Sequence, residues 1–274
     1  MQENSIKPYE PEAQKKPSLL YQRTQALIGP QAMERIKGKK VIVFGAGGVG
    51  GYAIEALARS GVGTVTTVDF DVIEESNLNR QIFATRQSIG REKADVAAVR
   101  LKSINETIQA KYATEKVTPE NIRLFLIERY DYVIDAVDDV KAKIAIISYA
   151  LEKGVPVISC MGTGNKLHPE LLQVADISRT QGCPLARAVR KGLKEMGITE
   201  GVRVVYSEEA PVTEGISEDG KTVPASAVFV PATAGLLMAA EVFRAGAVPP
   251  APEDWSLGQR VPRVDVEEKV TGTG

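Results

Sequence analysis

Short apolar runs alternate with amphipathic segments through the first 160 residues. Runs rich in β-branched residues at 40–44, 64–71 and 132–137 are typical of buried strands, and residues 90–104 carry apolar side chains at helical spacing. The other predicted elements here are helices at 48–60, 119–128 and 139–152 and strands at 108–114 and 156–160. This alternation predicts an α/β fold, with a Rossmann-like, mostly parallel sheet and helices on both faces.

The pattern is less regular in the C-terminal half. It predicts strands at 171–177, 202–207 and 227–231 and helices at 184–196 and 232–245, which form an irregular, mixed region. Residues 225–240 are strongly apolar, but Pro231 and Thr233 interrupt them and the run is shorter than the ~20 residues that a membrane span needs. We therefore expect a strand and a core helix there, and no membrane association.

Both ends of the chain lack a periodic apolar pattern and are rich in proline. Residues 1–18 are expected to form a flexible arm and residues 248–274 a mobile tail. We expect the structured body, 19–247, to form a single domain.

The composition excludes several classes of protein and of metal site. The 34 Lys and Arg against 35 Asp and Glu give a net charge of −1, which excludes a globally basic nucleic-acid binder but not a local basic patch. Two cysteines cannot form a four-cysteine zinc site, and a single histidine excludes a multi-histidine metal centre. The low cysteine content and the absence of a signal peptide favour a cytoplasmic protein.

A glycine-rich sequence, GAGGVG at 45–50, follows the first strand and opens a helix. Gly45, Gly47, Gly48 and Gly50 allow a tight turn whose backbone amides can approach a phosphate. Asp69, at the end of the second strand, is placed to accept hydrogen bonds from ribose hydroxyls. The pattern predicts an adenine-nucleotide site.

The residues that follow favour a triphosphate over a dinucleotide. They include Asp71, a polar loop with Asn77 and Arg80, Lys93 in the first turn of a helix, and Asp138 just beyond another strand. All fall at the carboxyl edge of one parallel sheet. Arg and Lys neutralise phosphate oxygens, and a carboxylate with a triphosphate holds Mg²⁺.

The motifs GAGGVG, DFD (69–71), SNLNRQ (76–81), GREKA (90–94) and DAVDD (135–139) resemble, in this order, the adenylating enzymes of the ThiF/MoeB/HesA group, relatives of the ubiquitin-activating enzymes. The resemblance covers about residues 20–246. It implies that Asp69 binds ribose, that Asn77, Arg80 and Lys93 surround the triphosphate of ATP, and that Asp138 binds Mg²⁺. It also implies a homodimer in which Arg23 reaches the partner's site.

Two further segments, RTQALIG (23–29) and CPLARAVRKGLKEMGI (183–198), resemble the tRNA threonylcarbamoyladenosine dehydratase (TcdA/CsdL) family. The resemblance implies a ligase-type, tRNA-modifying dehydratase. Such enzymes use ATP to activate a carboxylate of threonylcarbamoyladenosine beside the anticodon and to cyclise it with loss of water. The chain has no C-x-x-C pair, so we expect no structural zinc. A bound monovalent cation and a cysteine-desulfurase system as partner are compatible with the sequence.

A tRNA substrate requires a basic surface despite the net charge. Residues 179–203 carry a local charge of +4, and helical spacing places four cations on one face: Arg187, Arg190, Lys191 and Lys194. These are the candidate tRNA-binding residues, although a solvated helix face has the same pattern. Cys183, in a predicted loop, is a weak candidate nucleophile, and Cys160 is expected to be a small buried residue.

The sequence leaves three alternatives open. An activator of a ubiquitin-like sulfur-carrier protein shares the adenylation step, but the missing zinc pairs argue against it. In an NAD-dependent oxidoreductase, Arg80, Lys93 and Asp138 would have no role. The same charged residues argue against a non-catalytic nucleotide-binding adaptor.

Overall fold

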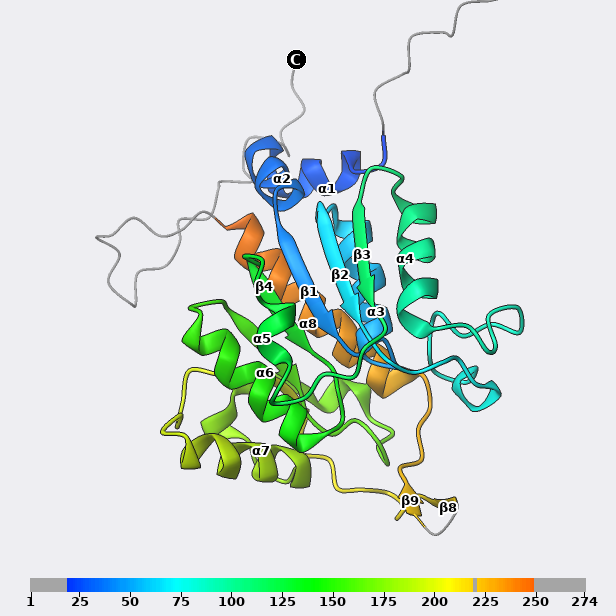
Figure 1. Ribbon diagram of the computed structural model, residues 1–274, viewed down its shortest axis with the longest axis vertical. Helices are drawn as coiled ribbons and strands as arrows, with labels where there is room; N and C mark the ends of the chain where they lie inside the picture. Colours follow the sequence, from blue (N-terminus) through cyan, green and yellow to red (C-terminus); the bar gives the residue numbers. More distant parts are fainter. Residues whose placement is uncertain (1–18, 219–220, 249–274) are drawn as a thin grey trace, which may run out of the picture.

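The strands form one seven-stranded sheet. In the computed structural model, which describes residues 19–218 and 221–248, the strand order is β3-β2-β1-β4-β5-β7-β6 (Figure 1). The strands are β1 Lys40–Phe44, β2 Thr64–Val68, β3 Gln109–Ala113, β4 Tyr132–Asp135, β5 Val157–Cys160, β6 Leu172–Asp176 and β7 Arg203–Ser207. Edge strand β6 pairs antiparallel with β7, and the other neighbours pair in parallel. The predicted Rossmann-like, mostly parallel sheet is confirmed.

Helices cover both faces of this sheet (Figure 1). One face is covered by α3 Gly50–Ser60, α4 Lys93–Ile104 and α8 Phe229–Ala247, and the other by α5 Ile122–Phe125, α6 Val140–Glu152 and α7 Pro184–Glu195. Because strand side chains alternate between faces, Val41 and Val43 belong to the first core, and Ile42 and Phe44 to the second.

Several short elements lie outside these layers. Helices α1 Gln22–Ile28 and α2 Pro30–Lys37 precede β1 at the amino-terminal edge of the sheet (Figure 1), and a hairpin, β8 Ile216–Glu218 with β9 Lys221–Val223, precedes α8. Three 3-10 helices complete the set: η1 Glu75–Asn77, η2 Pro169–Leu171 and η3 Ile177–Arg179.

The strand predicted at 227–231 is wrong, because α8 begins at Phe229. Pro231 lies in the first turn of that helix, where its missing N–H leaves no hydrogen bond unmade. Gly235 lets α8 lie directly on α3, since a Cβ at this position would be 2.2 Å from the carbonyl oxygen of Val49. The apolar run is therefore part of one long helix whose inner face is buried.

The helix predicted at 119–128 is only four residues long, as α5. The Asn121 side chain accepts a hydrogen bond from the amide of Thr118 (2.7 Å) and donates one to the carbonyl oxygen of Lys116 (2.9 Å). These local bonds favour a turn before Ile122, so the helix begins three residues later than predicted.

The order of the sheet reverses direction between β1 and β4, where successive crossovers diverge. In open α/β sheets this point leaves a crevice at the carboxyl ends of the strands, and ligands bind there. No helix in the described ranges is long and apolar enough to cross a membrane. The predicted arm (1–18) and all but the first residue of the predicted tail lie outside the described residues.

Candidate active site

The glycine-rich turn joins β1 to α3 at this crevice. Gly45 has φ +90°, and a Cβ on it would lie 2.7 Å from the carbonyl oxygen of Ala136, in the turn after β4. A Cβ on Gly50 would lie 1.8 Å from the carbonyl oxygen of Gly45. At Gly47, by contrast, the nearest atom would be 3.9 Å away. The turn thus packs closely against the protein on one side and leaves room at Gly47 for a ligand.

Asp69, directly after β2, holds this turn in place. Its carboxylate accepts hydrogen bonds from the amides of Ala46 (2.6 Å) and Asp71 (2.9 Å). Burial raises the pKa of Asp69, while these two amides and Lys93 act in the opposite direction. Each carboxylate oxygen retains a lone pair that can accept a ribose hydroxyl.

Lys93, the first residue of α4, has a side chain that is only 8% exposed, and its ammonium lies 2.8 Å from a carboxylate oxygen of Asp71. The amide of Lys93 also donates to the carbonyl oxygen of Asp71 (3.0 Å). The DFD segment and the start of α4 are therefore joined twice. One ammonium N–H is held by Asp71, which leaves two donors for phosphate oxygens.

Arg80 lies across the glycine-rich turn, because a Cβ on Gly48 would be 3.5 Å from its Cγ. Its guanidinium donates to the carbonyl oxygen of Ser76 and to the side-chain oxygen of Asn79, both at 2.9 Å. Buried Asn77 supports this loop: its side chain accepts from the amide of Glu74 (3.1 Å), and its carbonyl oxygen accepts from the amide of Arg80 (3.1 Å). In the described structure Asn77 thus positions Arg80.

Asp138 follows β4 and is exposed, with no hydrogen bond or ion pair to the described residues. The neighbouring Asp139 caps α6 by accepting from the amide of Ala142 (2.8 Å). No group of three or more His, Cys, Asp or Glu that could hold a metal occurs within the described ranges. A single free carboxylate fits Mg²⁺, which takes one or two carboxylates and completes its shell with phosphates and water.

The structure therefore brings the motif residues together at one edge of the sheet, with the glycine-rich turn in the middle. Arg23 is not among them. It lies on α1, and Tyr21, two residues earlier, bonds to the carbonyl oxygen of Ala58 near the far end of α3 (2.8 Å). That end is about 15 Å from the turn, at 1.5 Å per residue.

The four cations predicted to form one face of α7 differ in their surroundings. Arg187, Lys191 and Lys194 are exposed, whereas Arg190 is half-buried. The guanidinium of Arg190 donates to the carbonyl oxygen and the hydroxyl of Thr180, at 2.8 and 2.5 Å. Arg190 therefore anchors the middle of α7 to the end of η3, while the other three face solvent.

Both cysteines are buried, at 3% exposure for Cys160 and 4% for Cys183. Burial raises the pKa of the Cys160 thiol to about 12, so this thiol stays protonated at neutral pH. Cys183 is the N-cap residue of α7, and a Cβ on Gly162 would lie 3.5 Å from its sulfur. Neither thiol is accessible as a nucleophile in this conformation.

Sequence reasoning missed a polar clasp beside the crevice, formed by the loop after β5 and the segment after β7. Buried Lys166 donates to the carbonyl oxygens of Ser207 (3.3 Å) and Glu209, and the Glu209 carboxylate accepts from the amides of Leu167 (2.8 Å) and His168 (3.1 Å). No spacing motif joins these residues, which are about forty positions apart.

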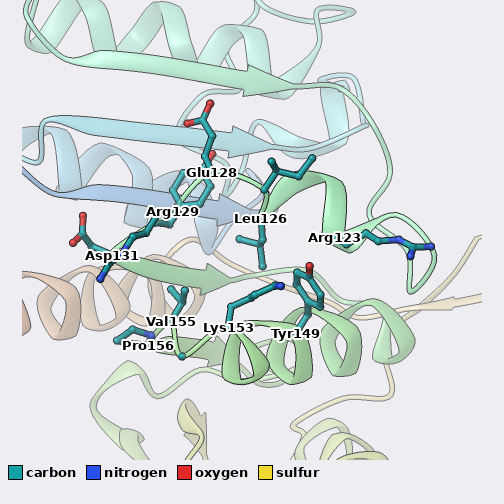
Figure 2. Close-up of a pocket in the computed structure, with 12 residues that line it drawn as sticks. Arg123, Leu126, Glu128, Arg129, Asp131, Tyr149, Lys153, Val155 and Pro156 are labelled. Carbon is teal, nitrogen blue, oxygen red and sulfur yellow. The ribbon is translucent and has the colours of Figure 1, made fainter.

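A cavity of about 530 Å³ lies at the other edge of the sheet, where β4 and β5 begin (Figure 2). Leu126, Tyr149 and Val155 supply apolar walls, and Arg123 and Lys153 supply cations. Because its acidic residues Glu128 and Asp131 pair with Lys111 and Lys39, and the C-terminal end of α6 faces it, we assign it no part in the nucleotide site.

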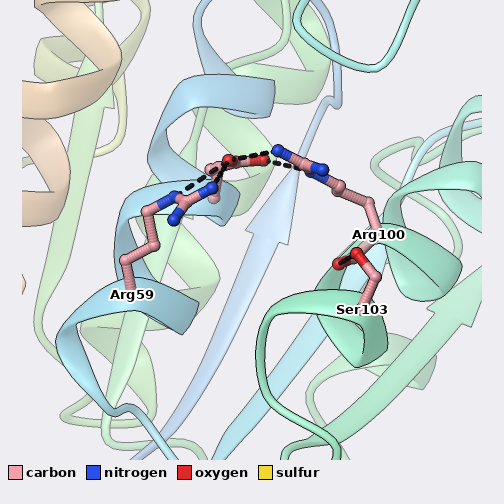
Figure 3. Close-up of polar contacts among 4 residues, drawn as sticks. Arg59, Arg100 and Ser103 are labelled. Atoms are coloured by element: carbon pink, nitrogen blue, oxygen red, sulfur yellow. Dashed lines mark hydrogen bonds and ion pairs between the residues drawn. The ribbon is translucent and has the colours of Figure 1, made fainter. Parts of the chain in front are cut away.

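A charged cluster joins α3 to α4, on the face of the sheet that these helices cover with α8. The buried Glu55 carboxylate accepts from Arg59 on α3 (2.9 and 2.5 Å) and from Arg100 on α4 (both 2.9 Å), and Figure 3 shows the two guanidiniums converging on it. Burial acts to raise the pKa of Glu55, but the bonds from Arg100 and Arg59 outweigh it and hold this pKa below its usual value.

Glu55→Gln is expected to lower the free energy of unfolding by about 1–2 kcal/mol at neutral pH, since both guanidiniums are half exposed and screened. A carboxyl group whose pKa is lowered on folding stabilises the folded state at pH values above its unfolded-state pKa of about 4.3. This stabilisation is lost as the pH falls through the folded-state pKa. The difference between wild type and variant should therefore shrink below about pH 4.3 in urea titrations. Glu34→Gln, at an exposed pair, is the control; an equal loss there would contradict a special role for Glu55.

Comparisons with known proteins agree with this geometry. The ThiF family model matches residues 21–251. The tRNA threonylcarbamoyladenosine dehydratase of Bacillus subtilis is 38% identical over 236 residues, 81% of this chain and 92% of that protein, and the Escherichia coli enzyme of the same name is 38% identical over 196 residues, 69% and 73%. The crystal structure of the E. coli enzyme with AMP superposes with a TM-score of 0.77 at 35% identity, covering 82% of this chain and 92% of that one, and another structure contains ATP. The chain belongs to the ThiF family and, within it, to the tRNA threonylcarbamoyladenosine dehydratases.

Proposed function

We propose that this protein uses ATP to cyclise threonylcarbamoyladenosine beside the anticodon of tRNA, with loss of water. The observation that carries the proposal is the convergence of Asp69, Lys93, Arg80 and Asp138 on the glycine-rich turn at the switch point of the sheet. The similar tRNA threonylcarbamoyladenosine dehydratases suggest the substrate, and the structures of the E. coli enzyme with ATP and AMP support ATP as the co-substrate.

The first step activates the carboxylate of the modified nucleoside. A carboxylate oxygen attacks the α-phosphorus of ATP, the bond between the α-phosphorus and the bridging oxygen breaks, and pyrophosphate leaves with its electron pair. Lys93 and Arg80 stabilise the negative charge that develops on the phosphates, and the backbone amides of the glycine-rich turn orient them. Mg²⁺ held by Asp138 would add charge stabilisation on the departing pyrophosphate.

The second step closes the ring. A nitrogen of the same side chain attacks the activated carbonyl carbon, the carbon–oxygen bond to AMP breaks, and the nitrogen loses a proton. The carboxylate oxygen leaves in AMP, so ATP hydrolysis to AMP and pyrophosphate accounts for the water removed. Because the attack is intramolecular, positioning supplies much of the acceleration and no enzyme nucleophile is needed.

The direct test incubates the purified protein with ATP, Mg²⁺ and tRNA carrying threonylcarbamoyladenosine, followed by mass analysis of the nucleosides. We expect a product lighter by one water, with AMP and pyrophosphate formed in equal amounts. Pyrophosphate exchange that required a carrier protein ending in Gly-Gly, with no change in the tRNA, would instead favour a sulfur-carrier activator. Such an enzyme from Thermus thermophilus is 36% identical over 131 residues, 48% of this chain.

Replacing both cysteines should leave this activity intact. The ring-closing nitrogen belongs to the substrate, and both thiols are buried. Cys160→Ala combined with Cys183→Ala is expected to form the cyclic nucleoside at close to the wild-type rate, with some loss of stability from the two small cavities. A folded, ATP-binding double variant without product would argue for a thioester intermediate.

The proposal includes a homodimer. Leu27 on α1 and Leu236 on α8 are 80% and 50% exposed, and they line a shallow apolar groove of about 430 Å³ together with Ile82 and Phe243. A second copy of the chain is the proposed occupant. Such a face would carry Arg23, which has no partner among the described residues, toward the other protomer.

Arg23→Ala and Asp138→Ala should each inactivate the homodimer yet restore activity when mixed. In a mixed dimer one site contains its own Asp138 and the partner's intact Arg23. Activity measured on purified mixed dimers, selected with two different tags, is expected to reappear at one site per dimer. Inactive mixed dimers would show that Arg23 acts in its own protomer or not at all.

The tRNA surface is proposed to lie on α7, through Arg187, Lys191 and Lys194. A cytoplasmic location and a cysteine-desulfurase system as a protein partner complete the proposal; the first follows from the tRNA substrate.

A further inference from the structure

A complete ion pair is buried in the core beneath the candidate active site. Lys143 of α6 and Asp135 of β4 are both 0% exposed, and the Lys143 ammonium lies 3.0 Å from Oδ2 of Asp135. Ser159 of β5, also 0% exposed, donates to the same oxygen (2.5 Å) and receives a hydrogen bond from Lys143 (3.3 Å). These three residues form a closed network at the carboxyl ends of two adjacent strands.

Stability alone does not account for such a network. Removing two charges from water is costly, and replacing a buried ion pair by apolar residues of similar size is often neutral or stabilising. The surroundings on this face of the sheet are apolar, since Ile146 and Ile147 on α6 and Val133 on β4 are fully buried there. The network is therefore better explained by a role in holding the nearby backbone in one conformation.

The geometry that it fixes is the turn from β4 to α6. The second oxygen of Asp135, Oδ1, accepts from the amide of Val137 (3.2 Å), and between them Ala136 packs against Gly45 of the glycine-rich turn. At the other end of the turn Asp139 accepts from the amide of Ala142. Asp138 lies between these two fixed points, and its exposed carboxylate, unlike that of Asp139, has no hydrogen-bond partner among the described residues.

We infer that Asp135, Lys143 and Ser159 are positioning residues that hold the Asp138 carboxylate in place for Mg²⁺. The inference rests on the proposed function, in which Asp138 binds the metal. Lys143 cannot touch the nucleotide or the tRNA, because it is fully buried and its ammonium is directed to Asp135 and Ser159. Any effect of Lys143 on ligand binding must therefore act through the turn from β4 to α6.

The test is the gain in ATP affinity that Mg²⁺ produces, measured by calorimetry as the ratio of the dissociation constants without and with Mg²⁺. Lys143→Met keeps the length and removes the charge. It is expected to lower this ratio by about 10- to 100-fold, as the loss of partners that orient metal ligands does. Asp138→Asn should lower the ratio similarly, and combining the two should add little, because both act on one carboxylate.

Ile146→Ala is the matched control, since it lies one turn along the same helix, is fully buried and does not join the network. It should lose thermal stability and keep the wild-type ratio. Ser159→Ala, which leaves the ion pair intact, serves if Lys143→Met does not fold; it should lower the ratio in the same direction. Amide exchange at Val137 in the nucleotide-free protein provides a second readout and should accelerate in both network variants.

The outcomes distinguish a failure of the positioning role from a failure of the metal role of Asp138. A wild-type ratio in folded Lys143→Met or Ser159→Ala, while Asp138→Asn lowers it, overturns the positioning role and leaves the proposed function standing. A ratio that Asp138→Asn does not change overturns the metal role of Asp138, and the inference with it. A fall in the ratio for Ile146→Ala equal to that for Lys143→Met also overturns it, because any destabilisation of α6 would then suffice.

Discussion

Lys93→Ala is expected to lower ATP-dependent turnover by about 10²–10³-fold, the cost of removing one preorganised donor to developing negative charge. Lys93 is buried, its backbone and side chain are both bonded to Asp71, and no other lysine lies in the motif. The loss should appear in kcat as well as in ATP affinity, because charge grows on the phosphates in the transition state. Lys102→Ala, an exposed change in the last turn of the same helix, should have little effect.

Arg80→Ala should produce a loss of the same order. Its side chain lies over the glycine-rich turn, and hydrogen bonds to Ser76 and Asn79 fix the position of its guanidinium. The substitution therefore removes a positive charge that is already held in place. Arg86→Ala is the matched control, since Arg86 lies in the same loop region in an exposed pair with Glu75. Wild-type turnover and ATP affinity in either motif variant would contradict the assignment of this crevice as the triphosphate site.

The sheet could be predicted because buried parallel strands have a local signal. Residues 41–44 and 157–160 are buried on both faces of the sheet and are mostly apolar in sequence. The beginning of the apolar run, at 227–231, had no such signal, since Val and Phe suit a strand as well as the first turn of a helix. What decides it is the close contact of Gly235 with α3, which is a tertiary interaction.

The site residues could be predicted by position but not by environment. Motif spacing places Asp71 near Lys93, yet only the structure shows that they form an ion pair. Nothing in the spacing separates Arg190, bonded to Thr180, from its exposed neighbours on α7. The buried Lys143 does have a signal, because it occupies a position on the apolar stripe of α6 with Ile147 and Ala150. A lysine at such a position predicts a buried acidic partner.

The largest effect on substrate binding is expected from the exposed cations of α7. Changing Arg187, Lys191 and Lys194 together to glutamine should weaken tRNA binding and leave ATP affinity unchanged, because these residues lie outside the nucleotide crevice. Each phosphate contact contributes through counterion release, with a slope of log affinity against log salt of about −0.9 on duplex and −0.7 on single strands. The slope should therefore flatten by about two to three units if all three contact phosphates.

The measurement is tRNA affinity across a salt series for wild type, the triple variant and a control. The control changes Lys37, Lys102 and Lys111 to glutamine, which removes the same charge from other exposed positions. Arg190 is left unchanged because its loss would remove the hydrogen bonds that anchor α7 to Thr180. If the lines for wild type and the triple variant coincide, α7 is a solvated face and the tRNA binds elsewhere. If the control flattens the slope equally, the effect belongs to net charge and α7 has no special role, whereas a change confined to the α7 variant places the phosphate backbone along this helix.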